Sequence, residues 1–321
     1  MAIIGGDIQR AKLLLEQGEL VAIPTETVYG LAGNALEPTA ITKIFAAKDR
    51  PYFDPLIVHF SSLEAARHYV EDIPQQAKLL TSRFWPGPLT LLLQKKQLIP
   101  DLVTAGLDRV GIRCPDHPLT RTLLKQLSFP LAAPSANPFG YVSPTTAQHV
   151  EDQLGEKVSY ILDGGPCRIG IESTIIGWED GQAIIYRLGG ISAEQIETVI
   201  GKVETRPYST SQPQAPGQLK SHYAPGKKFL LGDIHALSAK HQSLRLGILS
   251  FQKKELKVKS EFHLTLSPSG DLNEAARNLF SMLRKVDKMN VDLILAEEVP
   301  DEGLGRAIND RLRRASSQST G

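Results

Sequence analysis

Short apolar runs alternate with amphipathic stretches along residues 1–206 of the chain. The short runs have the length of buried strands, and apolar residues spaced three or four apart predict helices. The expected strands cover residues 20–23, 56–60, 89–93, 110–113, 131–133, 159–162, 174–178 and 183–187. The expected helices cover residues 8–17, 38–50, 62–70, 74–83, 118–127, 144–154 and 193–200. Because strands and helices interleave without strict alternation, we predict an α/β (or α+β) fold with a twisted mixed sheet.

Local signals mark the ends of several expected helices. Asp7 can accept hydrogen bonds from the first amides of its helix, and Gly18 suits a helix stop. Pro38 fits the first turn of the next helix. Pro51 ends that helix, because the residue before a proline is displaced from the α region.

Residues 207–228 differ in composition from the segments on either side. Prolines and glycines interrupt a run that has almost no aliphatic residues, which is typical of a linker. Beyond it, strands are expected at 229–231, 244–250, 262–266 and 293–296, and helices at 273–289 and 306–315. This alternation predicts a small Rossmann-like α/β domain, although the Gly-x-Gly-x-x-Gly fingerprint is missing. We therefore expect a domain over residues 1–206, a linker over 207–228 and a second domain over 229–321.

The composition is that of an ordinary globular protein, with 41% hydrophobic and 22% charged residues in a chain of 321. Cys114 and Cys167 have no metal-type spacing and form no disulfide framework, which favours a reducing compartment. The N-terminus lacks a basic segment followed by an apolar run, and no apolar run approaches the ~18 residues of a membrane span. We expect a soluble, cytoplasmic protein with no membrane partner.

The formal net charge of +1 gives no strong overall field. Residues 227–321 nevertheless hold 16 Lys and Arg against 12 Asp and Glu. This excess keeps an RNA-binding module open as the rival class of function, because a basic groove can hold RNA through phosphate contacts alone. The near-neutral total and the lack of interleaved aromatic and basic residues weigh against that class.

Lys48 and Arg50 lie two positions apart at the end of an expected helix, just before Pro51. Two cations in that place can clamp a polyphosphate, with arginine as a bidentate fork and lysine as a mobile point charge. The pair also fits simple compensation of the helix dipole. Spacing alone favours the second interpretation.

Further polar residues stand in or after apolar strands. Ser135 and Asn137 can offer a hydroxyl and an amide to a nucleotide, or form a turn with nothing bound. His59 fits either a satisfied buried histidine or a ligand contact. Arg113 fits either a carboxylate binder or a structural ion pair, and Ser173 can be a simple strand-edge hydroxyl.

Several familiar catalytic patterns are missing from the sequence. Gly226-Lys227-Lys228 is similar to the end of a Walker loop, but lysine stands where serine or threonine is required. There is no Gly-x-Ser-x-Gly elbow, no zinc cluster and no paired-carboxylate signature. Any ATP site must therefore be built from scattered residues.

A set of motifs follows in order over nearly the whole chain. They are Pro24-Thr25-Glu26-Thr27-Val28-Tyr29-Gly30-Leu31, Lys48-Asp49-Arg50-Pro51, Pro55-Leu56-Ile57-Val58-His59, Trp85-Pro86-Gly87-Pro88-Leu89-Thr90, Gly111-Ile112-Arg113, Pro134-Ser135-Ala136-Asn137, Glu172-Ser173-Thr174-Ile175, Pro216-Gly217, Ser221-His222-Tyr223-Ala224-Pro225, Gly303-Leu304-Gly305 and Arg311-Leu312. In this combination the chain resembles the threonylcarbamoyl-AMP synthase family in its two-domain form. That form has a YrdC-like catalytic domain, a linker and a small C-terminal domain.

The resemblance implies an enzyme, a nucleotidyltransferase that uses L-threonine, bicarbonate or carbon dioxide, and ATP. The threonine amine would be carboxylated, the carbamate would attack the α-phosphate, and threonylcarbamoyl-AMP and pyrophosphate would form. Partner enzymes would transfer the threonylcarbamoyl group to the adenosine beside the anticodon of tRNA, so contact with tRNA itself can be indirect. A carbamoyl-transfer domain of another pathway would need zinc-finger segments that the sequence lacks. The resemblance further implies a concave, positively charged groove.

The resemblance also assigns residues to the site. The nucleotide phosphates and the carbamate would be held by the signature tetrad of Lys48, Arg50, Ser135 and Asn137. The nucleotide would further contact Asp54, Ser143, Arg187 and Tyr223. Threonine would be framed by Thr25, Thr27, Tyr29, His59, Arg113, Ala133 and Ser173, with Arg113 as partner of its carboxylate. Mg²⁺ would enter with ATP, because no dedicated carboxylate cage is visible.

Asp54 departs from the family pattern, which usually has asparagine before Pro-Leu. A carboxylate near a triphosphate should repel it. Asp54 therefore either turns away from the nucleotide or helps to place Mg²⁺.

The linker also acquires a role through the resemblance. With His222 and Tyr223 it would fold over the nucleotide as a lid that excludes water from a labile carbamate and adenylate. A passive tether is the alternative.

Overall fold

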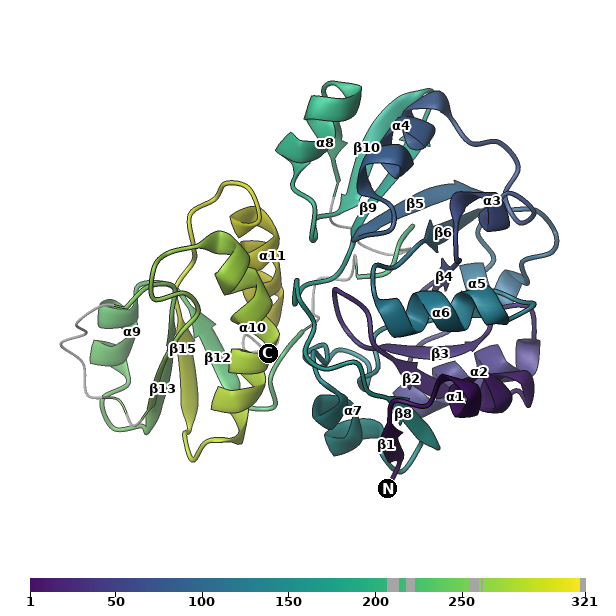
Figure 1. Ribbon diagram of the computed structural model, residues 1–321. Coiled ribbons are helices and arrows are strands. Elements are labelled where there is room, and N and C mark those ends of the chain that lie inside the picture. Colours follow the sequence, from purple (N-terminus) through teal and green to yellow (C-terminus); the bar gives the residue numbers. More distant parts are fainter. Residues whose placement is uncertain (207–213, 218–222, 254–259, 261, 318–321) are drawn as a thin grey trace. The chain divides into compact units, whose positions relative to one another are not determined.

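The computed structural model describes residues 1–206, 214–217, 223–253, 260 and 262–317 (Figure 1). Its contacts divide the chain into two units, each described here by itself. The first unit comprises residues 1–139, 144–168 and 172–219, and the second comprises residues 140–143, 169–171 and 220–321. Much of the predicted linker, including Ser221 and His222, lies outside the described residues, so its role as a lid stays a prediction.

The first unit is built on one large mixed sheet (Figure 1). Its strands are β1 (Ile3–Gly5), β2 (Val21–Ile23), β3 (Gly30–Asn34), β4 (Ile57–His59), β5 (Leu89–Gln94), β6 (Arg109–Arg113), β7 (Leu131–Ala132), β8 (Tyr160–Leu162), β9 (Thr174–Glu179), β10 (Gln182–Arg187) and β11 (Glu204–Thr205). Within the described residues they follow the order β1-β8-β2-β3-β7-β4-β6-β5-β9-β10-β11. Parallel pairs such as β4 with β6 stand beside antiparallel pairs such as β5 with β6, which confirms the predicted mixed sheet.

Short helices connect these strands. They are α1 (Ile8–Glu16), α2 (Pro38–Lys48), α3 (Leu63–Ala66), α4 (Gln75–Phe84), α5 (Asp101–Thr104), α6 (Pro118–Gln126), α7 (Ala147–Leu154) and α8 (Ala193–Ile200). The Asp7 carboxylate accepts hydrogen bonds from the first amides of α1, and Pro38 occupies the first turn of α2, so both predicted helix starts are confirmed.

Three predicted helices were too long by two residues or more, and one of them, expected over residues 38–50, ends at Lys48 before Pro51 is reached. The helix expected over residues 62–70 ends at Ala66, and Val70 instead forms a bridge to Lys95, directly after β5. The helix expected from Pro144 begins later, because the Thr146 hydroxyl caps it by accepting from the amide of His149. The Pro144 carbonyl instead accepts a 2.8 Å hydrogen bond from the amide of Tyr29.

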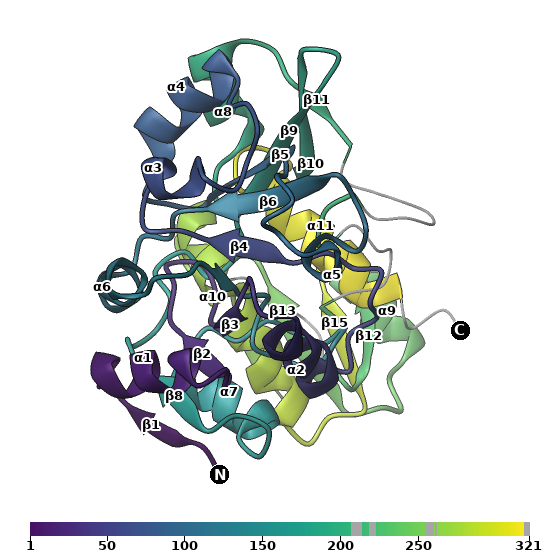
Figure 2. The same ribbon diagram turned by 90° about the vertical axis from the view of Figure 1, so that its right-hand side faces the viewer.

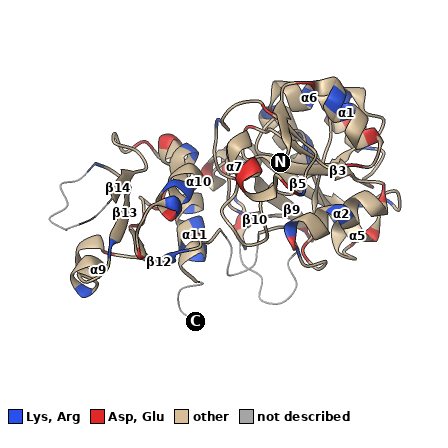
Figure 3. Cartoon of the chain, turned by 90° about the horizontal axis from the view of Figure 1, so that it is seen from below, with Lys and Arg blue, Asp and Glu red and all other residues tan. Residues whose placement is uncertain are grey.

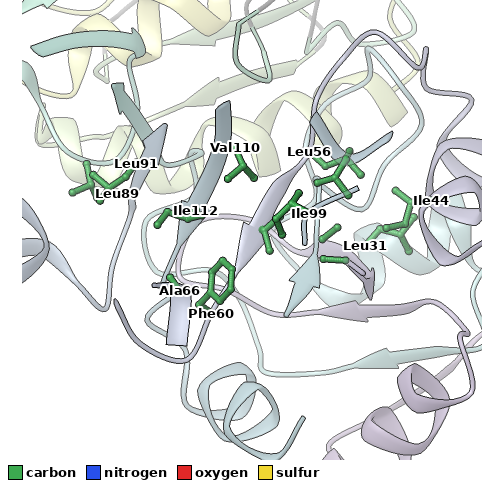
Figure 4. Close-up of a cluster of buried hydrophobic side chains, with 14 of the residues drawn as sticks. Leu31, Ile44, Leu56, Phe60, Ala66, Leu89, Leu91, Ile99, Val110 and Ile112 are labelled. Atoms are coloured by element: carbon green, nitrogen blue, oxygen red, sulfur yellow. The ribbon is translucent and has the colours of Figure 1, made fainter. Parts of the chain in front are cut away.

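Strand alternation divides the core of the first unit between the two faces of the sheet. On one face, Ala22 and Leu31 pack with apolar residues of α2, α4, α7 and α8. On the other face, Val21, Ile23 and Ala32 pack with α1 and α6. Figure 4 shows part of the first cluster, where Leu31, Ile44, Leu56, Phe60, Ala66, Leu89, Leu91, Ile99, Val110 and Ile112 are labelled.

The second face continues beyond α1 and α6 with a smaller apolar cluster. It consists of Ile57, Leu92, Ile175, Ile184, Tyr186 and Ala215. On β4 and β5, and directly before β9, polar residues at the same alternation as this cluster lie at His59, Thr90 and Ser173. The sheet therefore directs these polar residues to one face.

The second unit has its own parallel sheet (Figure 2). Its strands are β12 (Lys228–Leu231), β13 (Leu246–Ser250), β14 (Phe262–Thr265) and β15 (Leu293–Ala296), in the order β12-β15-β13-β14. Its helices are α9 (Ile234–Lys240), α10 (Leu272–Lys288) and α11 (Gly305–Ser316). The parallel α/β character agrees with the fold class predicted for this region. Within the described residues, no helix is long and apolar enough to cross a membrane.

Candidate functional site

The loop after β2 folds around the hydroxyl group of Thr25. This oxygen accepts from the amides of Thr27 and Val28, each at 3.2 Å, and donates to the Val28 carbonyl at 2.6 Å. The hydroxyl oxygens of Thr25 and Thr27 lie 2.8 Å apart. Thr25, Glu26 and Thr27 are all buried, so the chain has placed three polar side chains inside the unit at the end of a strand.

Arg113, at the end of β6, is the main partner of this loop. Its Nη2 atom donates to Glu26 Oε1 at 2.7 Å and to Thr27 Oγ1 at 2.9 Å, and its Nε donates to the Gly87 carbonyl at 3.3 Å. The other Glu26 oxygen accepts from the amide of Asp116 at 2.9 Å. Nη1 of Arg113 has no hydrogen-bond partner among the described residues. Arg113 therefore forms a structural ion pair with Glu26, and its Nη1 atom is left to bind a ligand.

Lys48 is placed by the end of α2. The next residue, Asp49, adopts a left-handed conformation with φ of 52°, which stops the helix after Lys48. The Lys48 ammonium then donates to the main-chain carbonyls of Ser135 and Asn137. Burial lowers the pKa of Lys48 well below its usual value, and the nearby Arg50 lowers it further. Lys48 thus contacts the main chain of Ser135 and Asn137, the other two members of the predicted tetrad besides Arg50.

Arg50 forms a buried ion pair with Asp54, with Nη2 and Oδ2 3.0 Å apart. The same guanidinium donates from Nε to the Asp54 carbonyl at 3.1 Å and from Nη2 to the Pro55 carbonyl at 2.7 Å. Burial raises the pKa of the Asp54 carboxyl, and the cations Arg50, Lys48 and Arg187 act in the opposite direction. Asp54 therefore faces the cations that were assigned to the nucleotide.

Arg187 reaches the site through an irregularity in the sheet. The pairing of β10 with β9 shifts register between Ile185 and Arg187, and such a bulge redirects the following side chain. Arg187 donates to the carbonyl and to the hydroxyl of Ser173, both at 3.0 Å, and to the Pro216 carbonyl at 3.2 Å. The Ser173 hydroxyl also lies 2.8 Å from that of Thr90.

His59 on β4 stands opposite Arg113 in the parallel register with β6. Burial, assisted by the Arg113 cation, lowers the pKa of His59 to about 3, so its imidazole is neutral near pH 7. Its Nδ1 atom is buried and has no hydrogen-bond partner among the described residues. A neutral imidazole has one nitrogen that donates and one that accepts, so it can form a hydrogen bond with a hydroxyl group of a ligand in either direction.

Tyr29 and Ala133 have mainly structural contacts. The Tyr29 hydroxyl donates to the Gly165 carbonyl at 2.8 Å and lies 3.2 Å from Asp163 Oδ1, so it holds the loop after β8. Burial raises the pKa of this hydroxyl. The Ala133 amide donates to the Ile57 carbonyl at 3.1 Å.

Two residues assigned to the nucleotide belong to the second unit. The Ser143 carbonyl accepts a 3.2 Å hydrogen bond from Arg284 Nε. The Tyr223 ring stacks on Phe280 with centroids 5.5 Å apart, and the Arg311 guanidinium lies 5.3 Å from the Tyr223 centroid. Tyr223 thus belongs to the packing of α10 and α11.

Glu26 and Thr90 are contacts that the sequence interpretation missed. Both stand inside motifs used for the resemblance, but neither was assigned a role. A signal for Glu26 was present, because the apolar run before Arg113 indicated a buried cation, which requires a nearby anion.

The surface charges that are visible in Figure 3 show no comparable concentration. Figure 3 shows Lys and Arg interspersed with Asp and Glu on the visible helices of the first unit. The cations described above are instead buried, with Lys48 at 1%, Arg113 at 4% and Arg187 at 5% exposure. In the described part of the chain, no group of three or more His, Cys, Asp or Glu residues could hold a metal ion by itself.

The first unit thus holds buried cations, buried hydroxyl groups and a neutral histidine, a combination that suits a small, anionic ligand. Residues 13–189 match the family model described as Telomere recombination (Sua5_yciO_yrdC). Residues 191–317 match the model described as Threonylcarbamoyl-AMP synthase, C-terminal domain. The chain belongs to the threonylcarbamoyl-AMP synthase family, as the motifs predicted.

Relatives and solved structures agree over the full length. The threonylcarbamoyl-AMP synthase of Pyrococcus abyssi is 41% identical over 328 residues, with 96% of this chain and 94% of the relative covered. The Bacillus subtilis protein of the same name is 40% identical over 320 residues, with 96% and 92% covered. The crystal structure of P. abyssi Sua5 complexed with L-threonine superimposes with a TM-score of 0.92 at 39% identity, covering 99% of this chain and 98% of that one.

Proposed function

We propose that the protein makes threonylcarbamoyl-AMP and pyrophosphate from L-threonine, bicarbonate or carbon dioxide, and ATP. It would be a nucleotidyltransferase whose product serves the threonylcarbamoyladenosine modification of tRNA beside the anticodon. One observation carries the proposal. The first unit contains Arg113, whose Nη1 atom is available, together with nearby hydroxyl groups and the neutral His59. The same unit also contains a second set of buried cations, Lys48, Arg50 and Arg187. The first set suits an amino acid, and the second suits a polyphosphate.

The amino-acid half is centred on Arg113. Its Nη1 atom has no partner among the described residues and would bind the threonine carboxylate, while Nη2 stays with Glu26 and Thr27. His59 and the hydroxyls of Thr25 and Thr27 would recognise the threonine hydroxyl group. Such a polar set favours threonine over an amino acid without that hydroxyl, because unpaired buried groups are costly.

The nucleotide half is centred on Lys48, Arg50 and Arg187. Phosphoryl-type transfer depends on positioning and on stabilisation of charge, so fixed cations can supply most of the catalysis. The Ser135 and Asn137 carbonyls orient Lys48, and the Ser173 hydroxyl orients Arg187. These cations would stabilise the charge that develops on the α-phosphate and on the leaving pyrophosphate.

The two halves are joined by Ser173. Its hydroxyl contacts Arg187 on the nucleotide side and the Thr90 hydroxyl on the other. The carbamate of threonine would therefore form between groups whose positions are set by the same sheet. We extend the proposal to Ser143 and Tyr223 as nucleotide contacts, to Mg²⁺ carried in with ATP, and to transfer enzymes of the cytoplasm as acceptors of the product.

Pyrophosphate release from ATP tests the proposal. The purified full chain is assayed with L-threonine and bicarbonate together, with each alone, and with neither, and the adenylate is identified by mass spectrometry. Release that requires both, with threonylcarbamoyl-AMP as product, is the expected result. Release independent of threonine, or salt-sensitive RNA binding without pyrophosphate release, would contradict it.

A further inference from the structure

Asp54 is a buried carboxylate whose two oxygens accept no hydrogen bond from the described residues. The residue is 1% exposed, and its Oδ2 atom lies 3.0 Å from Arg50 Nη2. Its Oδ1 atom is buried and has neither a hydrogen-bond nor an ion-pair partner among the described residues. A buried carboxylate oxygen is destabilising unless a donor or a cation meets it. The position therefore suits a ligand that brings positive charge.

The orientation of this carboxylate is fixed by its neighbour. Arg50 donates to the carbonyls of Asp54 and Pro55 as well as pairing with Oδ2, so the guanidinium holds both the backbone and the side chain of Asp54. The Asp54 amide donates to the Pro51 carbonyl at 3.2 Å. The carboxylate oxygens themselves accept no hydrogen bond within the described residues, so both remain able to meet a cation that a ligand brings.

The surrounding charges explain why a bare triphosphate would not be enough. Asp54 stands near Lys48, Arg50 and Arg187, the cations proposed to hold the phosphates. A phosphate brought to these cations alone would also meet the Asp54 carboxylate, and the two anions would repel. A divalent ion between them removes the repulsion, and its own charge has to be counted in such a site.

We infer that Asp54 supplies the protein's carboxylate ligand to the Mg²⁺ ion that accompanies ATP, and this inference rests on the proposed function. Mg²⁺ is commonly bound through one or two carboxylates together with substrate phosphates and water. The described residues hold no larger group of potential metal ligands, so a single carboxylate plus phosphates is the arrangement that fits.

Calorimetric titration with ATP tests the inference without relying on activity. The full chain is titrated with ATP in excess Mg²⁺ and with ATP in EDTA, as wild type, as Asp54→Asn and as Asp49→Asn. Asp49 is a matched control from the same motif, because its side chain is 77% exposed and pairs with Lys157 at 3.1 Å. Wild type and Asp49→Asn should bind ATP about tenfold more tightly with Mg²⁺ than without. Asp54→Asn should lose this difference and bind metal-free ATP at least as well as wild type.

The outcomes separate the possible roles of Asp54. If Asp54→Asn keeps the Mg²⁺-dependent gain, or improves both titrations equally, Asp54 is only a counter-ion and the inference is wrong. If wild type binds neither form of ATP, the proposed function itself is contradicted. Wild-type pyrophosphate release that needs threonine and bicarbonate, together with an unchanged Mg²⁺ effect in Asp54→Asn, overturns this inference alone.

A second measurement covers the case in which Asp54→Asn does not fold. Wild-type chain labelled with ¹³C at aspartate carboxylates is loaded with Mn²⁺ and ATP, and electron–nuclear double resonance detects ¹³C within bonding distance of the metal. A ¹³C coupling that Asp49→Asn retains, and that Asp54→Glu loses because glutamate carries no label, supports Asp54 as the ligand. The absence of any carboxylate coupling overturns it.

Discussion

The Oε1 atom of Glu26 lies 2.7 Å from the Nη2 atom of Arg113, and this ion pair is buried, with 1% and 5% of the side chains exposed. It joins the loop after β2 to the end of β6. Glu26 also accepts from the amide of Asp116 through its second oxygen. A single carboxylate thus fixes the guanidinium proposed to bind threonine.

Removing one partner of this pair should destabilise the first unit strongly. Glu26→Ala leaves the Arg113 charge buried without its anion, and such a change typically lowers the free energy of unfolding by about 3–5 kcal/mol. Urea unfolding followed by tryptophan fluorescence measures the effect in the first unit, because Trp85 and Trp178, the two tryptophans of the chain, both lie there.

A double-mutant cycle provides the control for this prediction. Glu26→Ala with Arg113→Ala should cost clearly less than the two single changes added together, because neither charge is then left alone. The exposed pair of Asp49 and Lys157 should contribute less than about 1 kcal/mol in the same assay. Additive effects of Glu26→Ala and Arg113→Ala would show that the pair does not act as a unit.

Lys48→Met should lower the rate of pyrophosphate release by about 10²–10³-fold, since it removes a fixed cation from the proposed phosphate site. It also removes the donor that holds the Ser135 and Asn137 carbonyls. Initial rates at saturating threonine, bicarbonate and ATP measure the effect. Lys43→Met on the same helix is the matched control, because Lys43 is exposed and pairs with Glu19. A Lys48→Met rate equal to that of Lys43→Met would remove Lys48 from the mechanism.

The fold was largely accessible from the sequence because the strong apolar periodicities coincide with real elements. The strand expected at 293–296 and the helix expected at 193–200 appear with the same bounds. β3 was missed because its sequence, Gly-Leu-Ala-Gly-Asn, is poor in β-branched residues. Its place is determined by pairing with β2 and β7, which no local pattern reveals.

The candidate site was accessible in part only. The resemblance carried by the motifs predicted that Lys48, Ser135 and Asn137 belong to one site. In the structure, Lys48 contacts the main chain of both other residues. The partners of Arg113 and Arg187 were not foreseen, because each depends on a distant segment. Glu26 is separated from Arg113 by 87 positions, and Arg187 is redirected by a bulge. Contacts of this kind arise from tertiary structure and leave little trace in local spacing.

Ser173→Ala should raise the KM for threonine and the KM for ATP together. The hydroxyl contacts Arg187 and Thr90, and a hydrogen bond to a charged group contributes about 1.5–3 kcal/mol, which corresponds to about tenfold or more. Steady-state kinetics with each substrate varied in turn measures both constants. Ser192→Ala removes a helix cap in the same unit and should lower stability by about 1 kcal/mol without changing either KM. A change confined to one substrate would mean that Ser173 does not link the two halves.

Because of His59, the free energy of unfolding of the first unit should depend on pH below pH 6.5, the usual pKa of a histidine. The pKa of His59 is lowered from 6.5 to about 3 in the fold, so between these values the unfolded chain binds a proton that the folded chain does not. The free energy of unfolding should therefore fall as the pH decreases from 6.5, by up to about 1.4 kcal/mol per pH unit. Urea unfolding at pH 6.5 and pH 5.0, followed by tryptophan fluorescence, should show a smaller decrease for His59→Gln than for wild type. The exposed His68→Gln should behave as wild type, and equal decreases in all three proteins would contradict the assignment to His59.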